Sequence, residues 1–299
     1  MNGLMRWALG RFGRGVAGGI LPVVAGLAPA LAQDADLAKK LSNPVASLIS
    51  VPFQFNYDGR IGPNDGGRAT LNIQPVIPIA INPEWNIISR TILPVISQWG
   101  LAPGLGRQFG LGDTVQSLFL SPQDPGPGGL IWGVGPAALL PTATDDLLGQ
   151  GRWGAGPTAV VLKQSGPWTV GALANHIWSV GGGTRSGTDP VNSTYFQPFI
   201  SYTTADAWTF SLNTESTYDW ANDKLTVPVN AVIAKLIKVG TQPVSVFVGA
   251  RYYALSPEAG PEGLGVRAGF TLLFPKYGEP STPRRLFRGL VARCLARLG

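Results

Sequence analysis

The chain has few of the residues on which enzymatic and metal chemistry usually depend. Its 299 residues include one cysteine, one histidine and two methionines. A single cysteine, Cys294, excludes an intrachain disulfide, and one histidine with a remote cysteine argues against a histidine-based metal site. Neither GxxxxGK nor GxSxG occurs, and Gly104-Leu105-Gly106 lacks the third glycine of a dinucleotide-binding loop. We therefore expect no cofactor and no metal.

Charged residues are also scarce, at 13% of the chain, and the positive ones gather at its two ends. Three arginines precede Val16, and six Lys or Arg residues follow Phe274. Between Gln33 and Phe274 the sequence has 14 Lys and Arg residues against 16 Asp and Glu residues. The net charge of +6 therefore does not describe the body of the chain. Without a basic surplus there, we expect no nucleic-acid partner.

Long apolar runs are absent after the first residues. The uncharged stretch 16–31 follows a basic start and ends in the small-x-small pattern Ala30-Leu31-Ala32, which is typical of a cleavable secretory signal. A membrane anchor is the alternative, but the stretch is shorter than the roughly 20 residues of a spanning helix. We therefore expect export and cleavage after Ala32.

The rest of the chain is rich in strand-length segments with one apolar face. Twelve candidate strands run over 48–59, 68–82, 85–98, 112–121, 129–140, 153–164, 167–180, 191–203, 207–216, 224–234, 243–254 and 263–274. Most reach the ~9–11 residues of a transmembrane strand. Joins after even-numbered strands are short, with 123–128 and 236–242 somewhat longer, whereas joins after odd-numbered strands include 100–111, 142–152, 181–190 and 216–223. This pattern predicts an all-β, antiparallel, up-and-down transmembrane barrel of about 12 strands in a bacterial outer membrane.

The predicted organisation is a signal peptide (1–32), a periplasmic N-terminal segment (33–47), the barrel (48–274) and a basic C-terminal extension (275–299). Residues 36–41 are expected to form a short helix, which either rests in the periplasmic mouth or leads into the first strand. The tail 284–298 has apolar residues at helical spacing among five arginines. It is either a surface-lipid binder or an extension without fixed structure.

Prolines inside the predicted strands need special sites, because proline lacks the N–H that a ladder requires. We expect a bulge or a locally unpaired site at each of Pro75, Pro78, Pro94, Pro198 and Pro228. The third strand, with Ile88 and Ile92 on the face of Arg90, and the seventh strand alternate poorly. Their register is therefore left open.

Tryptophans fall at the ends of the predicted strands. Trp85, Trp132, Trp168 and Trp208 begin strands at one end of the barrel, and Trp99, Trp153 and Trp178 lie at the other. Core packing is the alternative, but core tryptophans have no reason to favour strand ends. We interpret these residues as membrane-interface aromatics.

The polar faces of the strands predict the lining of the lumen. The lumen-lining candidates are Arg90, Glu215, Asn230, Arg251 and Arg267, with Gln54, Asn72, Gln74 and Asn213 beside them. A charge turned toward lipid at mid-membrane would cost ~2–4 kcal/mol. Either these side chains line a passage for a small solute, or their charges pair and fill the interior.

Catalysis would depend on the single histidine, His176, which follows Asn175. Outer-membrane lipases place a serine–histidine pair on the barrel wall, and Ser179 and Ser201 are the nearest candidates here. No spacing ties either serine to His176. We expect no catalytic residues and no enzyme.

Four stretches carry a resemblance to a known family: LAKKLSNPVASLISVPFQ at 37–54, GALANHIW at 171–178, NTESTYDW at 213–220 and TLLFPK at 271–276. They resemble a family of proteobacterial outer-membrane transporters that is similar to the barrel proteins of meta-cleavage phenol-degradation pathways. The resemblance spans roughly 36–276 and implies a barrel that takes up small molecules. This chain continues past the point where the family pattern ends, near Lys276.

The predicted function is an outer-membrane barrel that passes or binds small solutes, with aromatic or hydrophobic molecules as candidates. Its expected partners are outer-membrane lipid, the solute and the barrel-assembly machinery. The first alternative is a structural or surface-binding barrel whose loops, with Trp153, Arg185, Tyr218 and Trp220, contact a partner. The second is a lipid-modifying enzyme that uses His176.

Overall fold

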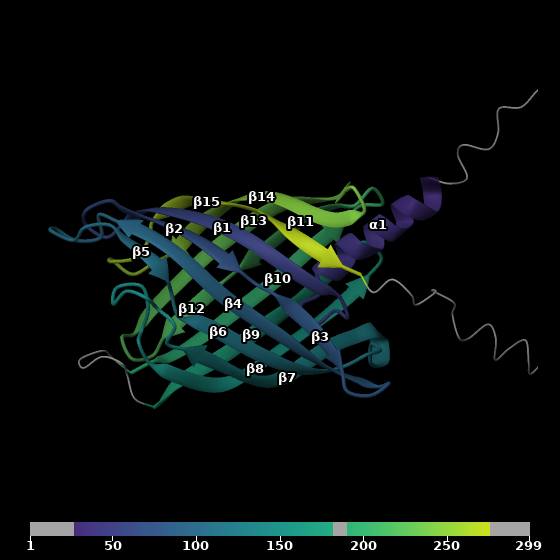
Figure 1. Cartoon of the computed structure of the whole chain (residues 1–299), viewed down its shortest axis with the longest axis horizontal. Helices are drawn as coiled ribbons and strands as arrows, with labels where there is room; N and C mark the ends of the chain where they lie inside the picture. The colour runs from purple at the N-terminus through teal and green to yellow at the C-terminus, as the bar shows by residue number, and fades with distance from the viewer. Residues whose placement is uncertain (1–26, 182–189, 276–299) are drawn as a thin grey trace, which may run out of the picture.

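The computed structural model describes residues 27–181 and 190–275, and these form one helix followed by a continuous run of strands (Figure 1). The elements are α1 (Leu27–Leu41), β1 (Ile49–Ile61), β2 (Gly66–Ile73), β3 (Val76–Ala80), β4 (Trp85–Trp99), β5 (Gln108–Leu111), β6 (Thr114–Pro122), a 3-10 turn η1 (Pro127–Gly129), β7 (Leu130–Leu140), β8 (Trp153–Ser165), β9 (Trp168–Gly181), β10 (Asn192–Thr203), β11 (Trp208–Thr214), β12 (Ser216–Asp219), β13 (Lys224–Val239), β14 (Gln242–Leu255) and β15 (Gly263–Phe274). The expected leader before residue 27, the tail after residue 275 and Arg185 lie outside the described residues.

The strands close into a barrel. Successive crossings of the wall pair antiparallel, and β15 returns to pair with β1 from Ile49↔Phe274 to Tyr57↔Val266. Closure leaves no unpaired edge strand. Because β2/β3, β5/β6 and β11/β12 are each one interrupted strand, the wall is crossed twelve times. The predicted antiparallel barrel of about 12 strands is confirmed.

The two ends of the barrel differ. At the end where α1 lies, here the helix end, β8 and β9 are joined by Gly166-Pro167 and β13 and β14 by Gly240-Thr241. At the opposite loop end, longer connections such as 141–152 join the strands. The expected joins 100–111 and 216–223 were drawn too long, since they contain β5 and β12. The expected join 236–242 was wrong, because strand pairing in β13 continues to Val239.

The interior prolines occupy the special sites predicted for them. Pro75 stands in the gap between β2 and β3, and a register shift separates Val227 from Pro228. Pro94 lies between the part of β4 that pairs with β5 and the part that pairs with β6. Pro198 lies between the part of β10 that pairs with β12 and the part that pairs with β11. Pro78 pairs with β4 but has no partner on β1. Each missing N–H thus falls at a break in the ladder.

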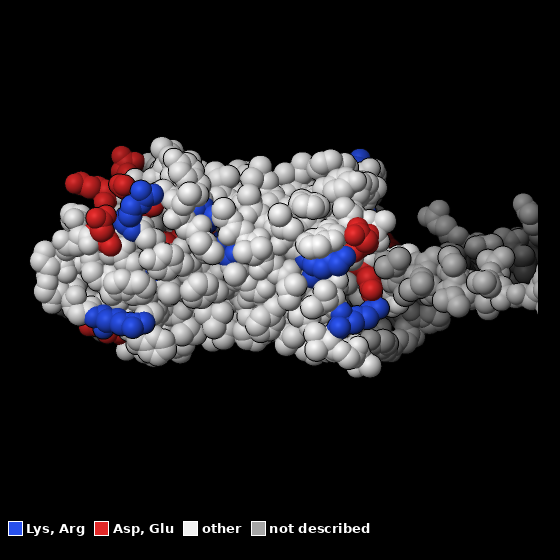
Figure 2. Space-filling model, turned by 90° about the horizontal axis from the view of Figure 1, so that it is seen from above, with Lys and Arg blue, Asp and Glu red and all other residues white. Residues whose placement is uncertain are grey.

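Side chains alternate between the outside and the inside of the barrel. Phe55 and Tyr57 are exposed on the outer face, whereas Asn56 and Asp58, which alternate with them, are buried inside. Large apolar side chains cover the outer face over most of the strands, and Figure 2 shows charged residues gathered mainly at the two ends. In β9, Leu173 and Ile177 are buried inside while Trp178 is exposed outside, which settles the register of the seventh strand.

The strand pattern alone suggested a uniformly polar interior, but part of the interior is apolar. Ile88, Phe119 and Leu162 point inward and form a buried cluster with Val45, Val160 and Leu173. Val45 belongs to the segment between α1 and β1, so the N-terminal part of the chain supplies core to the barrel.

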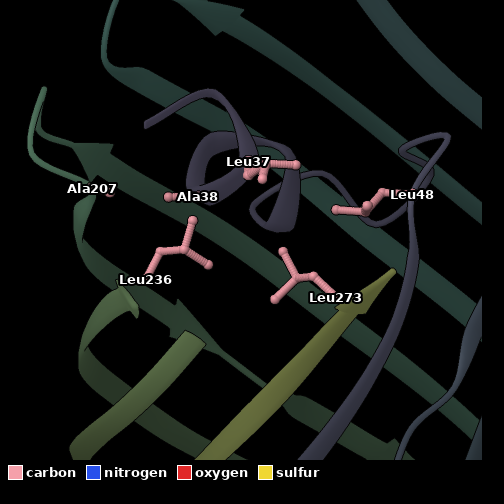
Figure 3. Packing of buried hydrophobic residues seen from close by; sticks show 6 residues of the cluster. All are labelled: Leu37, Ala38, Leu48, Ala207, Leu236 and Leu273. Carbon is pink, nitrogen blue, oxygen red and sulfur yellow. The ribbon is translucent and has the colours of Figure 1, made fainter. Parts of the chain in front are cut away.

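α1 packs into the helix end of the barrel. The expected helix ends at Leu41 as predicted but begins at Leu27, so it spans the expected cleavage site. Leu37 and Ala38 are buried against barrel residues Leu48, Ala207, Leu236 and Leu273 (Figure 3). Of the two alternatives for this helix, the structure favours the one in which it rests in the mouth. No helix within the described ranges is long and apolar enough to span a membrane.

Candidate functional site in the barrel interior

A buried ion cluster crosses the lumen toward the loop end. Arg267 on β15 is only 3% exposed, and its guanidinium donates to both carboxylate oxygens of Glu215, at 2.9 and 2.7 Å. Its Nε donates to Oδ1 of Asn56 at 2.8 Å. Glu215 lies between β11 and β12, and the sheet order places β13 and β14 between these strands and β15. The pair therefore spans the curve of the barrel and is geometrically well formed.

Arg251 extends the cluster toward β1. Its guanidinium lies 3.7 Å from a carboxylate oxygen of Asp58 and 3.7 Å from one of Glu215. It also covers the ring of Tyr253, with its Cζ 5.1 Å from the ring centroid. Two arginines thus share two carboxylates, and this part of the cluster is electrically balanced.

Amide side chains complete the inner surface at this level. Asn230, which is fully buried, donates to Asn213 at 2.9 Å. Arg90 on β4 donates through Nη2 to Oε1 of Gln74 at 3.2 Å. Of the five lumen-lining candidates, Glu215, Arg251 and Arg267 meet in one cluster. Asn230 is the cross-strand partner of Arg251, and Arg90 forms no direct ion pair with the cluster. Asp58 belongs to the cluster and was missed, although it shares the face of Gln54.

On the helix-end side of the cluster, the barrel holds a partly open cavity of about 300 Å³. Arg90, Arg267 and Asn213 line it on the side of the cluster, and the segment 40–46 lines it on the helix end. Leu173, Phe199 and Phe247 contribute apolar wall, and the hydroxyls of Ser201, Ser211 and Thr271 contribute polar wall. The size lies at the lower limit of small-molecule sites.

The N-terminal segment that bounds the cavity is held by polar contacts as well as by apolar packing. Lys39 Nζ donates to the carbonyl of Gly166 at 2.7 Å, and Gln164 donates back to the Lys39 carbonyl at 3.0 Å. Lys238 at the end of β13 pairs with Asp34 at 2.7 Å. These contacts hold α1 against two separate parts of the barrel wall at the helix end.

The tryptophans lie on the outer face near the barrel ends. Trp85 and Trp132 contact each other edge to face at 5.9 Å between ring centroids. Trp168 and Trp208 open β9 and β11 at the helix end and are 47% and 40% exposed. Trp178 lies near the loop end of β9 and is 48% exposed. Their role at a membrane interface stays a prediction.

His176 lies on the outer face of β9 near the loop end. Its Nδ1 is 2.7 Å from the hydroxyl of Thr194, and its ring is 4.0 Å from that of Trp178. Ser179 and Ser201 face the interior side of the wall, with Ser179 bonded to the backbone of Val191 and Ser201 paired in register with Thr169. Neither serine therefore forms a dyad with His176. Within residues 27–181 and 190–275, no group of His, Cys, Asp and Glu is arranged to hold a metal ion.

Comparisons with known proteins support the fold. No protein-family model matches the chain, and no curated protein matches it either. An outer membrane channel from Pseudomonas putida F1 is similar in structure, with a TM-score of 0.60, 16% identity, and coverage of 77% of this chain and 96% of that one.

Two further barrels are more distant. The KdgM porin, solved in complex with disordered oligogalacturonate, has a TM-score of 0.42, 10% identity, and coverage of 76% of this chain and 99% of that one. Outer membrane phospholipase A from Escherichia coli has a TM-score of 0.45, 11% identity, and coverage of 74% and 92%. At these TM-scores neither of the two carries an argument about this chain. The similarity to the Pseudomonas putida channel, at 16% identity, supports the fold alone.

Proposed function

We propose that this chain is an outer-membrane barrel that admits small solutes, aromatic or hydrophobic ones among them, to its interior cavity. The observation that carries the proposal is the cavity itself: it has mixed polar and apolar walls, with α1 at one end and the ion cluster at the other. A barrel that served only as a scaffold would have no need for an interior space of this size.

The outer surface supports placement in a bilayer. Apolar side chains such as Phe210, Val248 and Phe270 are exposed on the outer face. Exposure of so large an apolar surface to water would be unfavourable. In lipid the same face is satisfied, and a closed barrel leaves no backbone group unpaired at an edge. The short turns then lie in the periplasm and the long connections outside the cell. The similarity to a channel barrel is consistent with this arrangement.

Single-channel conductance of the purified full chain in a planar bilayer tests the proposal, after a heat-dependent gel shift has shown that the barrel is folded. Leu37→Asp is the informative variant, because Leu37 is 6% exposed within the packing that holds α1 in the mouth. A buried carboxylate there weakens that packing. We expect discrete steps whose amplitude or open time increases in Leu37→Asp, with Asp36→Asn on the exposed side of the helix as the control.

If both proteins are folded and silent, and radiolabelled solutes do not enter vesicles that contain them, the transport proposal fails. A surface-binding barrel then becomes the better interpretation. One observation favours it: Trp220 at the loop end is 57% exposed and stacks edge to face with Tyr218, at 4.6 Å. Loss of partner binding in Trp220→Ala with unchanged solute flux would support that second function.

A further inference from the structure

Arg90 differs from the other arginines that face the lumen. Arg267 and Arg251 lie within 4 Å of carboxylates, whereas no carboxylate of the described residues forms an ion pair with Arg90. Its one side-chain hydrogen bond is to the neutral amide oxygen of Gln74. A guanidinium carries five N–H donors in a planar fork. Arg90 therefore presents unused donors, and it does so at the wall of the cavity.

The charge balance of the interior points the same way. The described strands turn four arginines inward, Arg68, Arg90, Arg251 and Arg267, against two carboxylates, Asp58 and Glu215. Arg68 is bonded to Gln98 at 3.0 Å and does not line the cavity. Glu215 interacts electrostatically with Arg90, but both of its carboxylate oxygens accept hydrogen bonds from Arg267. Arg90 therefore has no carboxylate in direct contact, which is unfavourable for a cation in a confined interior. An anion held beside Arg90 would offset that cost.

Other parts of the cavity wall suit an apolar group. Leu173, Phe199 and Phe247 line it, and Val76, the cross-strand partner of Arg90, lies at the same level. A ligand that filled the space would thus meet a cationic fork at one point and apolar side chains over much of the remaining wall. The volume of about 300 Å³ limits it to a small molecule.

We propose that the cavity binds a small monocarboxylate with a compact apolar body, and that the carboxylate lies on the guanidinium of Arg90. This inference rests on the proposed function, since it names the class of solute. The planar fork of arginine matches the two oxygens of a carboxylate, which a lysine ammonium does not reproduce. A neutral molecule of the same shape would contact the apolar wall but leave the arginine without a carboxylate in direct contact.

The test is equilibrium binding of benzoate and of its neutral isostere benzamide to the purified full-length barrel in detergent. We expect saturable binding of benzoate, at least about tenfold tighter than that of benzamide. Arg90→Gln should weaken benzoate at least about tenfold and leave benzamide unchanged. Arg90→Lys should recover part of the affinity, and Arg68→Gln, which removes a lumen arginine outside the cavity, should bind like the unaltered protein.

Equal affinities for benzoate and benzamide would overturn the proposal, as would equal losses in Arg90→Gln and Arg68→Gln. The heat-dependent gel shift separates either result from misfolding, and retained benzamide binding in Arg90→Gln does so independently. Flux distinguishes this inference from the function on which it rests. Solute flux without a preference for carboxylates would refute only the substrate class, whereas specific benzoate binding by a barrel that passes nothing would refute only transport.

Discussion

The bond between Glu215 and Arg267 offers the sharpest test of how the interior is stabilised. Glu215→Gln keeps the shape of the side chain but removes the charge that accepts two hydrogen bonds from Arg267. Since Arg267 is only 3% exposed, water cannot replace the lost carboxylate. Removing one partner of a buried pair typically costs 3–5 kcal/mol. We expect a loss near the lower value, about 3 kcal/mol, because glutamine still accepts one hydrogen bond and Asn56 still contacts the guanidinium.

The measurement is reversible urea unfolding in phospholipid vesicles, followed by tryptophan fluorescence, with the free energy of unfolding obtained by linear extrapolation. The double variant Glu215→Gln, Arg267→Gln should lose less than the sum of the two single losses, because neither partner of this pair is then left as a charge without the other. Asp206→Asn, which alters an exposed ion pair with Lys235, serves as the control and should leave the unfolding midpoint nearly unchanged. A loss below about 1 kcal/mol for Glu215→Gln, or strict additivity in the double variant, would refute the assignment of a buried, mutually dependent pair.

Three further outcomes follow from the structure. Phe119→Ala should lower the free energy of unfolding by about 3–5 kcal/mol in the same assay, because the side chain is fully buried in the interior apolar cluster; an unchanged unfolding midpoint would mean that the cluster adds nothing. The Thr204 hydroxyl donates to the carboxylate of Asp206 and holds the pKa of that exposed carboxyl below its usual range. A carboxyl whose pKa is lowered by folding stabilises the fold at pH values above its unfolded pKa, and this contribution is lost as pH falls through the folded pKa. Thr204→Ala should therefore raise the Asp206 pKa in a carboxyl NMR titration, and the contribution should become smaller and be fully lost at a higher pH. His176→Ala should leave the lipid composition of the membrane unchanged by mass spectrometry, and accumulation of an unprocessed lipid would show instead that the histidine is catalytic.

The alternation of side chains predicts the architecture well, because a strand exposes every second residue to one face whatever its partner is. It also places Glu215, Arg251 and Arg267 on the inner wall. It does not predict which of them meet, since Glu215 and Arg267 are 52 residues apart and are brought together only by the curvature of the closed barrel. Asp58 was missed because its partner, Arg251, comes from β14 and only the closed barrel brings the two together. Asp58 also stands near a strand end.

The apolar part of the interior was harder to predict. A side chain such as Phe119 fits the outer face as well as the inner one by composition, and only the register of β6 against β4 assigns it to the inside. The segment that packs against it, with Val45, comes from before the first strand, where no periodicity of the strands applies. The contacts of α1 therefore could not be derived from the pattern that revealed the barrel.

The proline-marked breaks explain why the charge cluster lies where it does. Glu215 occupies the gap between β11 and β12, and its amide N–H donates to the carbonyl of Pro228 at 3.2 Å. On the other side, Pro198 of β10 has no partner on β11 or β12. Two prolines on flanking strands thus interrupt the ladder at the level of one carboxylate. Such a break changes the local direction of a strand and so can re-aim a side chain, and here the side chain reaches Arg267 across the lumen. The interruptions of the ladder therefore coincide with the two hydrogen bonds between Glu215 and Arg267. We infer that the irregular wall determines the position of the ion cluster.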